Sequence, residues 1–323
     1  MPVPDDRSWQ ITEPRRIDFD DPVTELEVRV VSGTVNVVGT DEPVTRLEIG
    51  KVEGPPLHVR REGGRLVVAY DDLPWRGFLN WLDRTRRRRE AEVSVRVPAD
   101  VTLSVGVVTA GAVVTGMRGT TTVAGVSGTT TLVGLSGPVQ AETVSGDVET
   151  RLLSGPLRFS TVSGDLTCID GTGGEIKADS VSGAMILDLG APRAGEAADI
   201  RLSSVSGEVA VRLPDDADLT VEARTTGGAV SSAFDELTTG GGWGDHWVAG
   251  TLGAGRGTLR AGNVTGGLAL LRRPPRDGMD PGPHPDGTAT VAAHAADPAP
   301  GAGPSSGPQP PETPGNPDPA KGL

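Results

Sequence analysis

The chain has 323 residues, with 46 glycines, 27 prolines and only 3% aromatic residues, and its formal net charge is −13. This composition favours many turns and a core of small side chains, and the negative charge argues against a general nucleic-acid binder, which needs a basic face. The single cysteine, Cys168, excludes an internal disulfide framework, and no cysteine and histidine set has zinc-ligand spacing.

The sequence 1–16, MPVPDDRSWQITEPRR, forms an N-terminal extension ahead of the predicted domain. It lacks the apolar stretch of a secretory signal, and no run of about 18 apolar residues occurs that would span a bilayer. We therefore expect a cytoplasmic protein. Export to the cell surface by a route without such a signal stays open.

Residues 17–273 are predicted to form one β domain, interrupted at 71–90 by DDLPWRGFLNWLDRTRRRRE. Its apolar residues follow helical spacing, and Pro74 suits a first helical turn, so this segment is predicted to be a short amphipathic helix. The candidate membrane or partner contacts are Trp75, Phe78, Leu79, Leu82, Arg84, Arg86, Arg87, Arg88 and Arg89. A basic amphipathic helix suits an anionic membrane, a nucleic acid or an acidic partner. The alternative is that its stripe packs on its own domain and the arginines are solvated.

The middle of the chain is repetitive. LSGPVQAETVSGDVETRL (135–152) and LSGPLRFSTVSGDLTCID (153–170) are identical at nine of 18 positions, so the period is 18, made of two related halves. Repeats of this kind indicate stacked units. The predicted turn glycines are Gly128, Gly137, Gly146, Gly155, Gly164, Gly174, Gly183 and Gly207, with a one-residue insertion near Thr172. We expect these glycines to supply a backbone conformation with positive φ.

Each half alternates between apolar and polar residues, as in Leu157 and Phe159 against Arg158 and Ser160. This alternation places one set on each face of a short strand. The pattern predicts an all-β solenoid of stacked two-strand coils, about 4.8 Å apart, with apolar ladders inside and polar ladders outside. Ser-Gly pairs at 32–33 and 206–207 extend it to both flanks, and APRAGEAAD (191–199) is predicted to loop out.

Two stretches lie near the C-terminus. GGWGDHWVAG (241–250) is predicted to cap the open end of the solenoid, and the alternative is an aromatic carbohydrate-binding loop. Residues 274–323 hold 14 of the 27 prolines and no aromatic residue, so a disordered tail is predicted.

The TVSGD turns, GTLGAGRGTLRAGNVTGGLALLRR (250–273) and the strand end at Val97-Pro98 resemble the bacterial putative-adhesin family of β-strand-repeat proteins. That family is a domain of unknown function, and the resemblance covers most of residues 17–273. It implies a β-helix-like fold and raises the expectation of surface binding.

Candidate chemistry is sparse. Asp147 and Asp165 should stack in adjacent coils, but calcium needs six to eight oxygens, so ordinary turn residues are the better interpretation. Scattered acids select no catalytic pair for glycoside hydrolysis, and Cys168 is predicted to be a buried, inert thiol. We therefore expect no metal, cofactor or enzymatic activity.

The leading hypothesis is a non-enzymatic, adhesin-like binding or scaffold protein that recognises a protein or polysaccharide partner through its regular surface. The alternative is a peripheral-membrane or partner-docking protein acting through residues 71–90. A carbohydrate-active enzyme is third. The oligomeric state and the handedness of the solenoid do not follow from the pattern.

Overall fold

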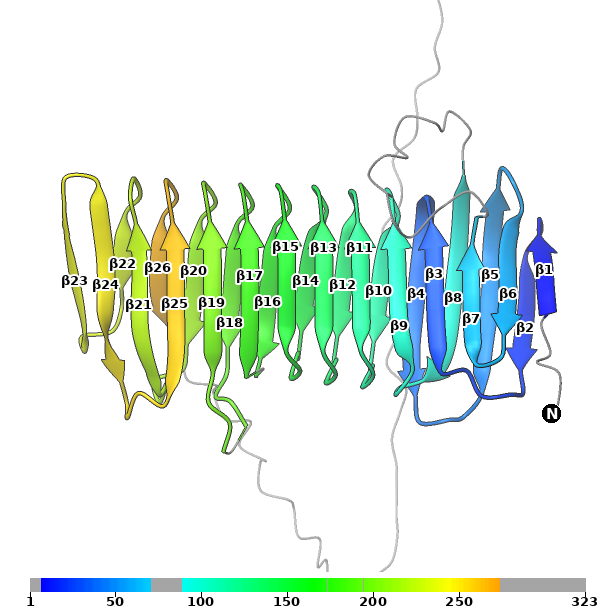
Figure 1. The fold of residues 1–323 in the computed structure, drawn as a ribbon, viewed down its shortest axis with the longest axis horizontal. Helices are drawn as coiled ribbons and strands as arrows, with labels where there is room; N and C mark the ends of the chain where they lie inside the picture. Colours follow the sequence, from blue (N-terminus) through cyan, green and yellow to red (C-terminus); the bar gives the residue numbers. More distant parts are fainter. Residues whose placement is uncertain (1–6, 71–88, 173, 194, 274–323) are drawn as a thin grey trace, which may run out of the picture. The chain divides into compact units, whose positions relative to one another are not determined.

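The computed structural model describes residues 7–70, 89–172, 174–193 and 195–273 (Figure 1). Within these ranges every regular element is a β-strand, and no helix there is long and apolar enough to span a bilayer. Of the predicted helical segment at 71–90, all but the last two residues lie outside the described residues, and Glu90 begins a β-strand rather than ending a helix; the predicted tail at 274–323 also lies outside them.

The strands form two sheets, called A and B below, with 14 and 12 members. In spatial order sheet A contains β1 (Arg7–Ile11), β6 (Leu57–Glu62), β7 (Arg65–Ala69), β3 (Glu25–Val30), β9 (Thr102–Val107), β11 (Thr121–Gly125), β13 (Val139–Thr143), β15 (Leu157–Thr161), β17 (Glu175–Ser180), β19 (Asp199–Ser204), β25 (Gly257–Asn263), β21 (Leu219–Thr225), β24 (Asp245–Leu252) and β23 (Leu237–Gly242). Sheet B contains β2 (Arg15–Phe19), β5 (Thr45–Glu53), β8 (Glu90–Pro98), β4 (Ser32–Thr40), β10 (Gly111–Thr115), β12 (Thr129–Val133), β14 (Asp147–Arg151), β16 (Leu166–Gly171), β18 (Met185–Leu189), β20 (Val209–Leu213), β26 (Leu268–Arg272) and β22 (Val230–Ser232).

The central coils each place one strand in sheet A and the next in sheet B. Parallel pairing joins Val139 to Leu157 and Val148 to Leu166, and the two members of each pair lie one period apart in the sequence. The predicted period of 18 residues therefore sets which residues pair between neighbouring coils. Each coil is a pair of short strands joined by two turns, one on the A-to-B edge and one on the B-to-A edge.

Two departures from the regular period are accommodated locally. A register shift between Cys168 and Gly171 adds one residue, so Leu157 pairs with Ile176 at a spacing of 19. The next coil pairs Ile176 with Ile200, a spacing of 24. The extra residues of that coil lie between β18 and β19, where the sequence predicted a looped-out insertion.

Both ends of the stack depart from the simple order of the chain. The strands β1, β2, β5 and β6 pair antiparallel at one end, as do β23 and β24 at the other. The coil of β25 and β26 lies between that of β19 and β20 and that of β21 and β22. Described strands begin at Arg7, ahead of residue 17, where the sequence suggested a domain boundary.

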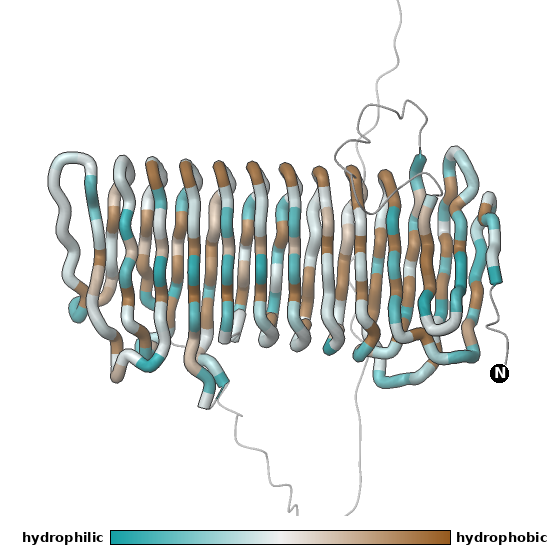
Figure 2. The backbone as a smooth tube through the Cα atoms, in the orientation of Figure 1, coloured by the Kyte–Doolittle hydropathy of each residue, from teal (hydrophilic) through white to brown (hydrophobic). Residues whose placement is uncertain are grey.

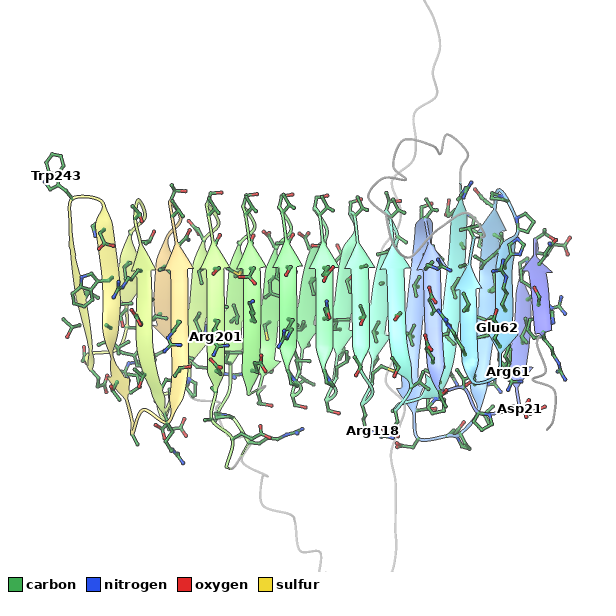
Figure 3. The ribbon with its side chains drawn as sticks, viewed as in Figure 1. Asp21, Arg61, Glu62, Arg118, Arg201 and Trp243 are labelled. Carbon is green, nitrogen blue, oxygen red and sulfur yellow. The ribbon has the colours of Figure 1, made fainter. Side chains whose placement is uncertain are left out.

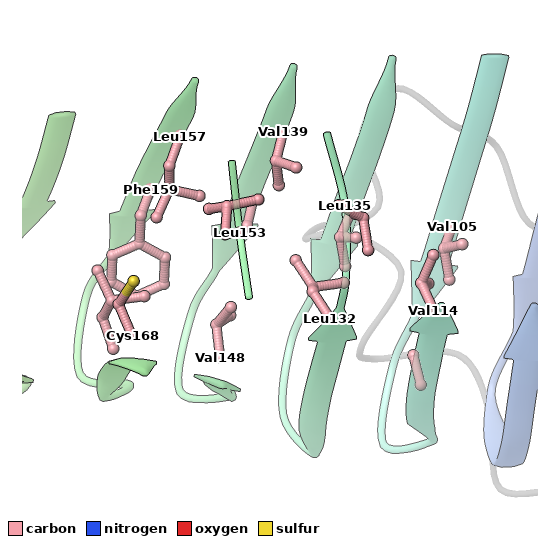
Figure 4. Close-up of a cluster of buried hydrophobic side chains, with 14 of the residues drawn as sticks. Val105, Val114, Leu132, Leu135, Val139, Val148, Leu153, Leu157, Phe159 and Cys168 are labelled. Carbon is pink, nitrogen blue, oxygen red and sulfur yellow. The ribbon is translucent and has the colours of Figure 1, made fainter. Parts of the chain in front are cut away.

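The core lies between the two sheets and follows the predicted alternation. The alternation places one pair of side chains inward on each of the six strands from β13 to β18, and every pair is buried: Val139 and Ala141, Val148 and Thr150, Leu157 and Phe159, Leu166 and Cys168, Ile176 and Ala178, and Met185 and Leu187. Figure 4 shows several of these side chains meeting between the sheets, with Leu135 and Leu153 entering from the B-to-A turns.

The predicted role of the turn glycines is wrong in detail. Of the eight, only Gly128 has positive φ. At most of the others a Cβ would collide with a carbonyl of the preceding coil, as at Gly146, where it would lie 2.6 Å from the Gly128 oxygen, and at Gly183 against the Gly164 oxygen. These glycines allow close stacking of turns. Gly174 is an exception, because a Cβ there meets only ordinary contacts.

Positive φ occurs instead at the tip of the B-to-A turns. Gly116, Gly134, Leu152 and Asp170 have φ of 70°, 66°, 54° and 54°, and each follows the last by one period. Leu152 and Asp170 adopt a left-handed conformation that side chains with a Cβ disfavour. The turn geometry therefore persists even where glycine is absent.

Candidate binding surfaces

Most of the predicted contact segment falls outside the described residues, and of its candidate site residues only Arg89 is described. The Arg89 guanidinium lies over the Tyr70 ring at 5.8 Å, and the Arg89 carbonyl accepts hydrogen bonds from the backbone N–H and the hydroxyl of Ser32. Burial raises the pKa of Tyr70 to about 12. Tyr70, which precedes the segment, and Arg89, which belongs to it, therefore lie on the A-to-B edge.

A ladder of buried polar side chains supports the A-to-B edge from inside. Its members are Thr143, Thr161, Ser180, Ser204, Asn263 and Thr225, one from each coil in spatial order. Each of the last five accepts a hydrogen bond from the turn glycine three residues later, as from Gly164 to Thr161 at 2.8 Å. Buried polar groups are costly unless bonded, so this ladder holds the turns in one conformation.

A row of valines follows on the outside of the same edge, directly after the polar ladder. We define the valine edge as Val144, Val162, Val181, Val205 and Val264. The last four expose 47–51% of their surface, and Val144 is half-buried. Figure 2 shows the apolar tips aligned along the upper turns of the stack. Val108 and Val126 occupy the same position in earlier coils and are buried.

Hydrogen bonds between coils keep the valine edge straight. The hydroxyls of Ser163, Ser182 and Ser206 each donate to the carbonyl of the valine one coil earlier, at 3.2–3.3 Å. The backbone N–H of each serine donates to the same carbonyl at 2.8–2.9 Å. Adjacent valines are thus held at the spacing of strands, about 4.8 Å. The outermost coil has Thr226 at this position, so the turn does not require valine.

The residues considered for catalysis or metal binding have structural roles. Asp147 Oδ1 accepts the N–H of Asp165 at 3.0 Å, and Asp165 Oδ1 accepts the N–H of Ala184 at 2.8 Å. They are turn residues that tie one coil to the next. Cys168 is fully buried, and burial raises the pKa of its thiol. No group of three or more metal-ligating side chains occurs within the described ranges.

The stretch with two tryptophans belongs to the hairpin of β23 and β24, which forms the last two strands of sheet A. Trp247 lies against Gly240, where a Cβ would come within 2.5 Å of its ring. Trp243 does not cover the end, because it is fully exposed at the hairpin tip (Figure 3). One tryptophan therefore packs on its own hairpin and the other faces solvent, so the predicted covering of the open end by both tryptophans is not what the hairpin does.

The described surface carries hollows of different sizes. An apolar hollow beside Leu189, Pro192 and Leu213 measures about 30 Å³, which is enough for a water molecule rather than a substrate. Two larger hollows, of about 350 and 170 Å³, lie on the outward face of sheet A. The fold thus offers edges and faces as its recognition surfaces.

These features define a two-sheet β-solenoid whose described surface is built from repeated rows. A family model matches residues 23–266, which is most of the chain. The chain belongs to this family, the Toastrack DUF4097 family. No curated protein matches the sequence.

Three solved structures are similar to this chain, each at 11% identity. A putative adhesin from Bacteroides fragilis covers 80% of this chain and 97% of its own, with a TM-score of 0.42. A putative cell adhesion protein from Clostridium sporogenes covers 81% and 100%, with a TM-score of 0.27. A putative lipid binding protein from Parabacteroides distasonis covers 81% and 97%, with a TM-score of 0.25.

Sequence reasoning missed the valine edge. The repeated Thr-Val-Ser-Gly was interpreted as a turn, and the face of its valine was not assigned. The available signal was the recurrence of valine at one turn position in successive coils, where a turn needs no apolar residue.

Proposed function

We propose that this chain is a non-enzymatic, adhesin-like binding protein that uses its β-stack as a scaffold for an extended partner. The observation that carries the proposal is the valine edge. Its side chains are half exposed and contribute little to the core. The outermost coil has Thr226 at the same position and keeps the turn. Contiguous apolar residues on a surface mark interaction sites.

The partner that fits this edge is a protein segment with both apolar and basic side chains. Five acids stand at the positions beside the row: Glu142, Asp147, Asp165, Asp179 and Glu208. Complementary charge on the partner would fix its register along the row. A second copy of this chain fits less well, because it would bring the same acids against each other and because four half-exposed valines offer far less than the ~800 Å² per partner of a stable interface.

Photo-cross-linking in the native host tests this proposal. A benzophenone amino acid replaces Val181 on the valine edge or Leu152, an exposed apolar residue of the opposite edge (58% exposed). We expect a discrete adduct with a basic partner protein from position 181 and none from position 152. An adduct only between two copies, or equal labelling from both positions, would overturn the proposed partner.

The segment at 71–90 supports a second proposal, that of a peripheral-membrane or partner-docking protein. Arg89 lies on the edge that carries the valines. Its carbonyl accepts the N–H of Ser32, as a valine carbonyl accepts the N–H of a serine in later coils. Binding of the full chain to anionic vesicles should then weaken with salt and on replacing Arg84, Arg86, Arg87 and Arg88 by Gln. Binding unchanged by these replacements would rule it out.

The cellular location separates binding to a partner inside the cell from adhesion to one outside it. We propose a cytoplasmic location, and protease treatment of intact host cells tests it. Protection of the protein from protease supports the cytoplasmic proposal, whereas digestion would place it outside and favour adhesion.

A further inference from the structure

Four cations form a straight row on the outward face of sheet A. Arg158, Lys177, Arg201 and Arg260 lie on β15, β17, β19 and β25 and pair in direct Cα register. Neighbouring members are therefore about 4.8 Å apart. The last step joins residues 59 positions apart in the sequence, because β25 inserts beside β19. We call this set the cationic row (Figure 3 labels Arg201).

Such a row opposes the stability of the sheet, because like charges directly opposite one another repel. Nearby acids offset the repulsion only in part. Arg158 contacts Glu175 at 3.3 Å, Lys177 contacts Asp179 at 3.6 Å, and Arg201 contacts Asp199 at 2.7 Å. These three cations remain 49–65% exposed, and exposed pairs are weak and readily exchanged.

Arg260 has no ion pair or hydrogen bond from its guanidinium to any described residue, and it is exposed. It lines the hollow of about 350 Å³ together with Arg201, Ser203, Glu222, Arg224 and Gly262. Gly262 opens the floor of this hollow, because a Cβ there would meet nothing within 4 Å. At the other end of the row, Arg158 and Lys177 line the hollow of about 170 Å³ with Gln140, Glu142, Ser160 and Asp179.

We propose that the cationic row binds a linear acidic polysaccharide. The carboxylates of successive sugars pair with the guanidinium and ammonium groups, which form strong charge-assisted hydrogen bonds. The flanking carboxylates of Glu175, Asp179 and Asp199 accept hydrogen bonds from sugar hydroxyls. A single DNA strand is a poorer fit, because its sugar-phosphate backbone offers acceptor oxygens but no hydroxyl donors to these carboxylates.

This ligand occupies a sheet face rather than the valine edge, so the inference stands apart from the proposed protein partner. A polymer lying across β15, β17, β19 and β25 would follow the stack direction and contact one cation per strand. The net charge of the whole chain is −13, so long-range attraction does not draw an anionic polymer to it. The four cations of the row therefore hold the ligand by direct contacts.

Calorimetric titration of the full chain with polygalacturonate tests the inference. The row variant Arg201→Gln/Arg260→Gln should lower affinity about tenfold, the loss of roughly two exposed charge contacts. The matched control, Arg151→Gln/Arg212→Gln, removes the same charge from β14 and β20 of sheet B and should change affinity less than twofold. Dextran, a neutral polymer, should not bind.

Three outcomes would overturn the inference: absence of polygalacturonate binding, equal loss in both double variants, or tighter row-dependent binding of single-stranded DNA. Arg260→Gln alone keeps the test valid if the double variant unfolds, since Arg260 has no described partner to lose. That single variant should weaken binding about threefold with an unchanged melting temperature. Valine-edge cross-linking is independent of these results, so each proposal fails separately.

Discussion

The two edges of the stack have turns at the same spacing, yet they bury opposite kinds of side chain. The A-to-B edge buries a ladder of threonine, serine and asparagine and exposes valine. The B-to-A edge buries Met117, Leu135 and Leu153 and exposes left-handed tips such as Leu152. In the coils from β13 onward the apolar core thus extends into one edge only, and the other edge is held by hydrogen bonds.

Because of this difference, the apolar residues of the B-to-A edge stabilise the fold, whereas the valines of the A-to-B edge are available for binding. At the B-to-A edge an apolar residue contributes to folding, and the insertion between β18 and β19 is tolerated there. At the A-to-B edge the exposed valines lie outside the core, while stacked glycines such as Gly183 and Gly155 keep the turns uniform at both edges. Substitutions that compare the two edges should therefore give unequal losses of stability.

The largest effect is expected at the stacked glycines. Gly183→Ala places a Cβ against the Gly164 carbonyl, and this overpacking of backbone should cost about 3 kcal/mol or more in the free energy of unfolding. Gly134→Ala at the opposite edge meets nothing within 4 Å and only strains a positive φ, so about 1 kcal/mol is expected. Urea unfolding measures both, and equal losses would contradict the stacking argument.

Truncation of one apolar residue on each edge gives an intermediate effect. Leu153→Ala removes a fully buried side chain and should cost about 2–4 kcal/mol. Val181→Ala removes a half-exposed one and should cost less than about 1 kcal/mol. Thermal unfolding of the two variants side by side checks this. A loss at Val181 as large as that at Leu153 would show that the valine edge belongs to the core.

The smallest effect is a gain. Leu152 is exposed and has a φ of 54°, so Leu152→Gly should relieve backbone strain and raise the free energy of unfolding by about 0.5–1 kcal/mol. Leu152→Ala keeps a Cβ in the same conformation and serves as the control, with no expected gain. Stabilisation by both variants would point to the exposed side chain rather than to the backbone.

Local pattern was enough to predict the coil. The alternation of Leu166 and Cys168 with polar residues, together with the constant repeat, predicted which side chains face inward and which strands pair. This works because strand periodicity and a constant repeat length are properties of neighbouring residues. The role of the turn glycines was not predicted, because it depends on how closely one coil approaches the next.

The sequence by itself therefore determined the all-β class, the length of the coil, the inward ladders and the buried thiol of Cys168, since each follows from short-range periodicity. Only the tertiary structure decided the antiparallel ends, the insertion of β25 beside β19 and hence the pairing of Arg201 with Arg260. It also decided that the recurring valines face solvent. These features depend on contacts between segments far apart in the chain, and no local pattern specifies which strand fills a given place in the stack.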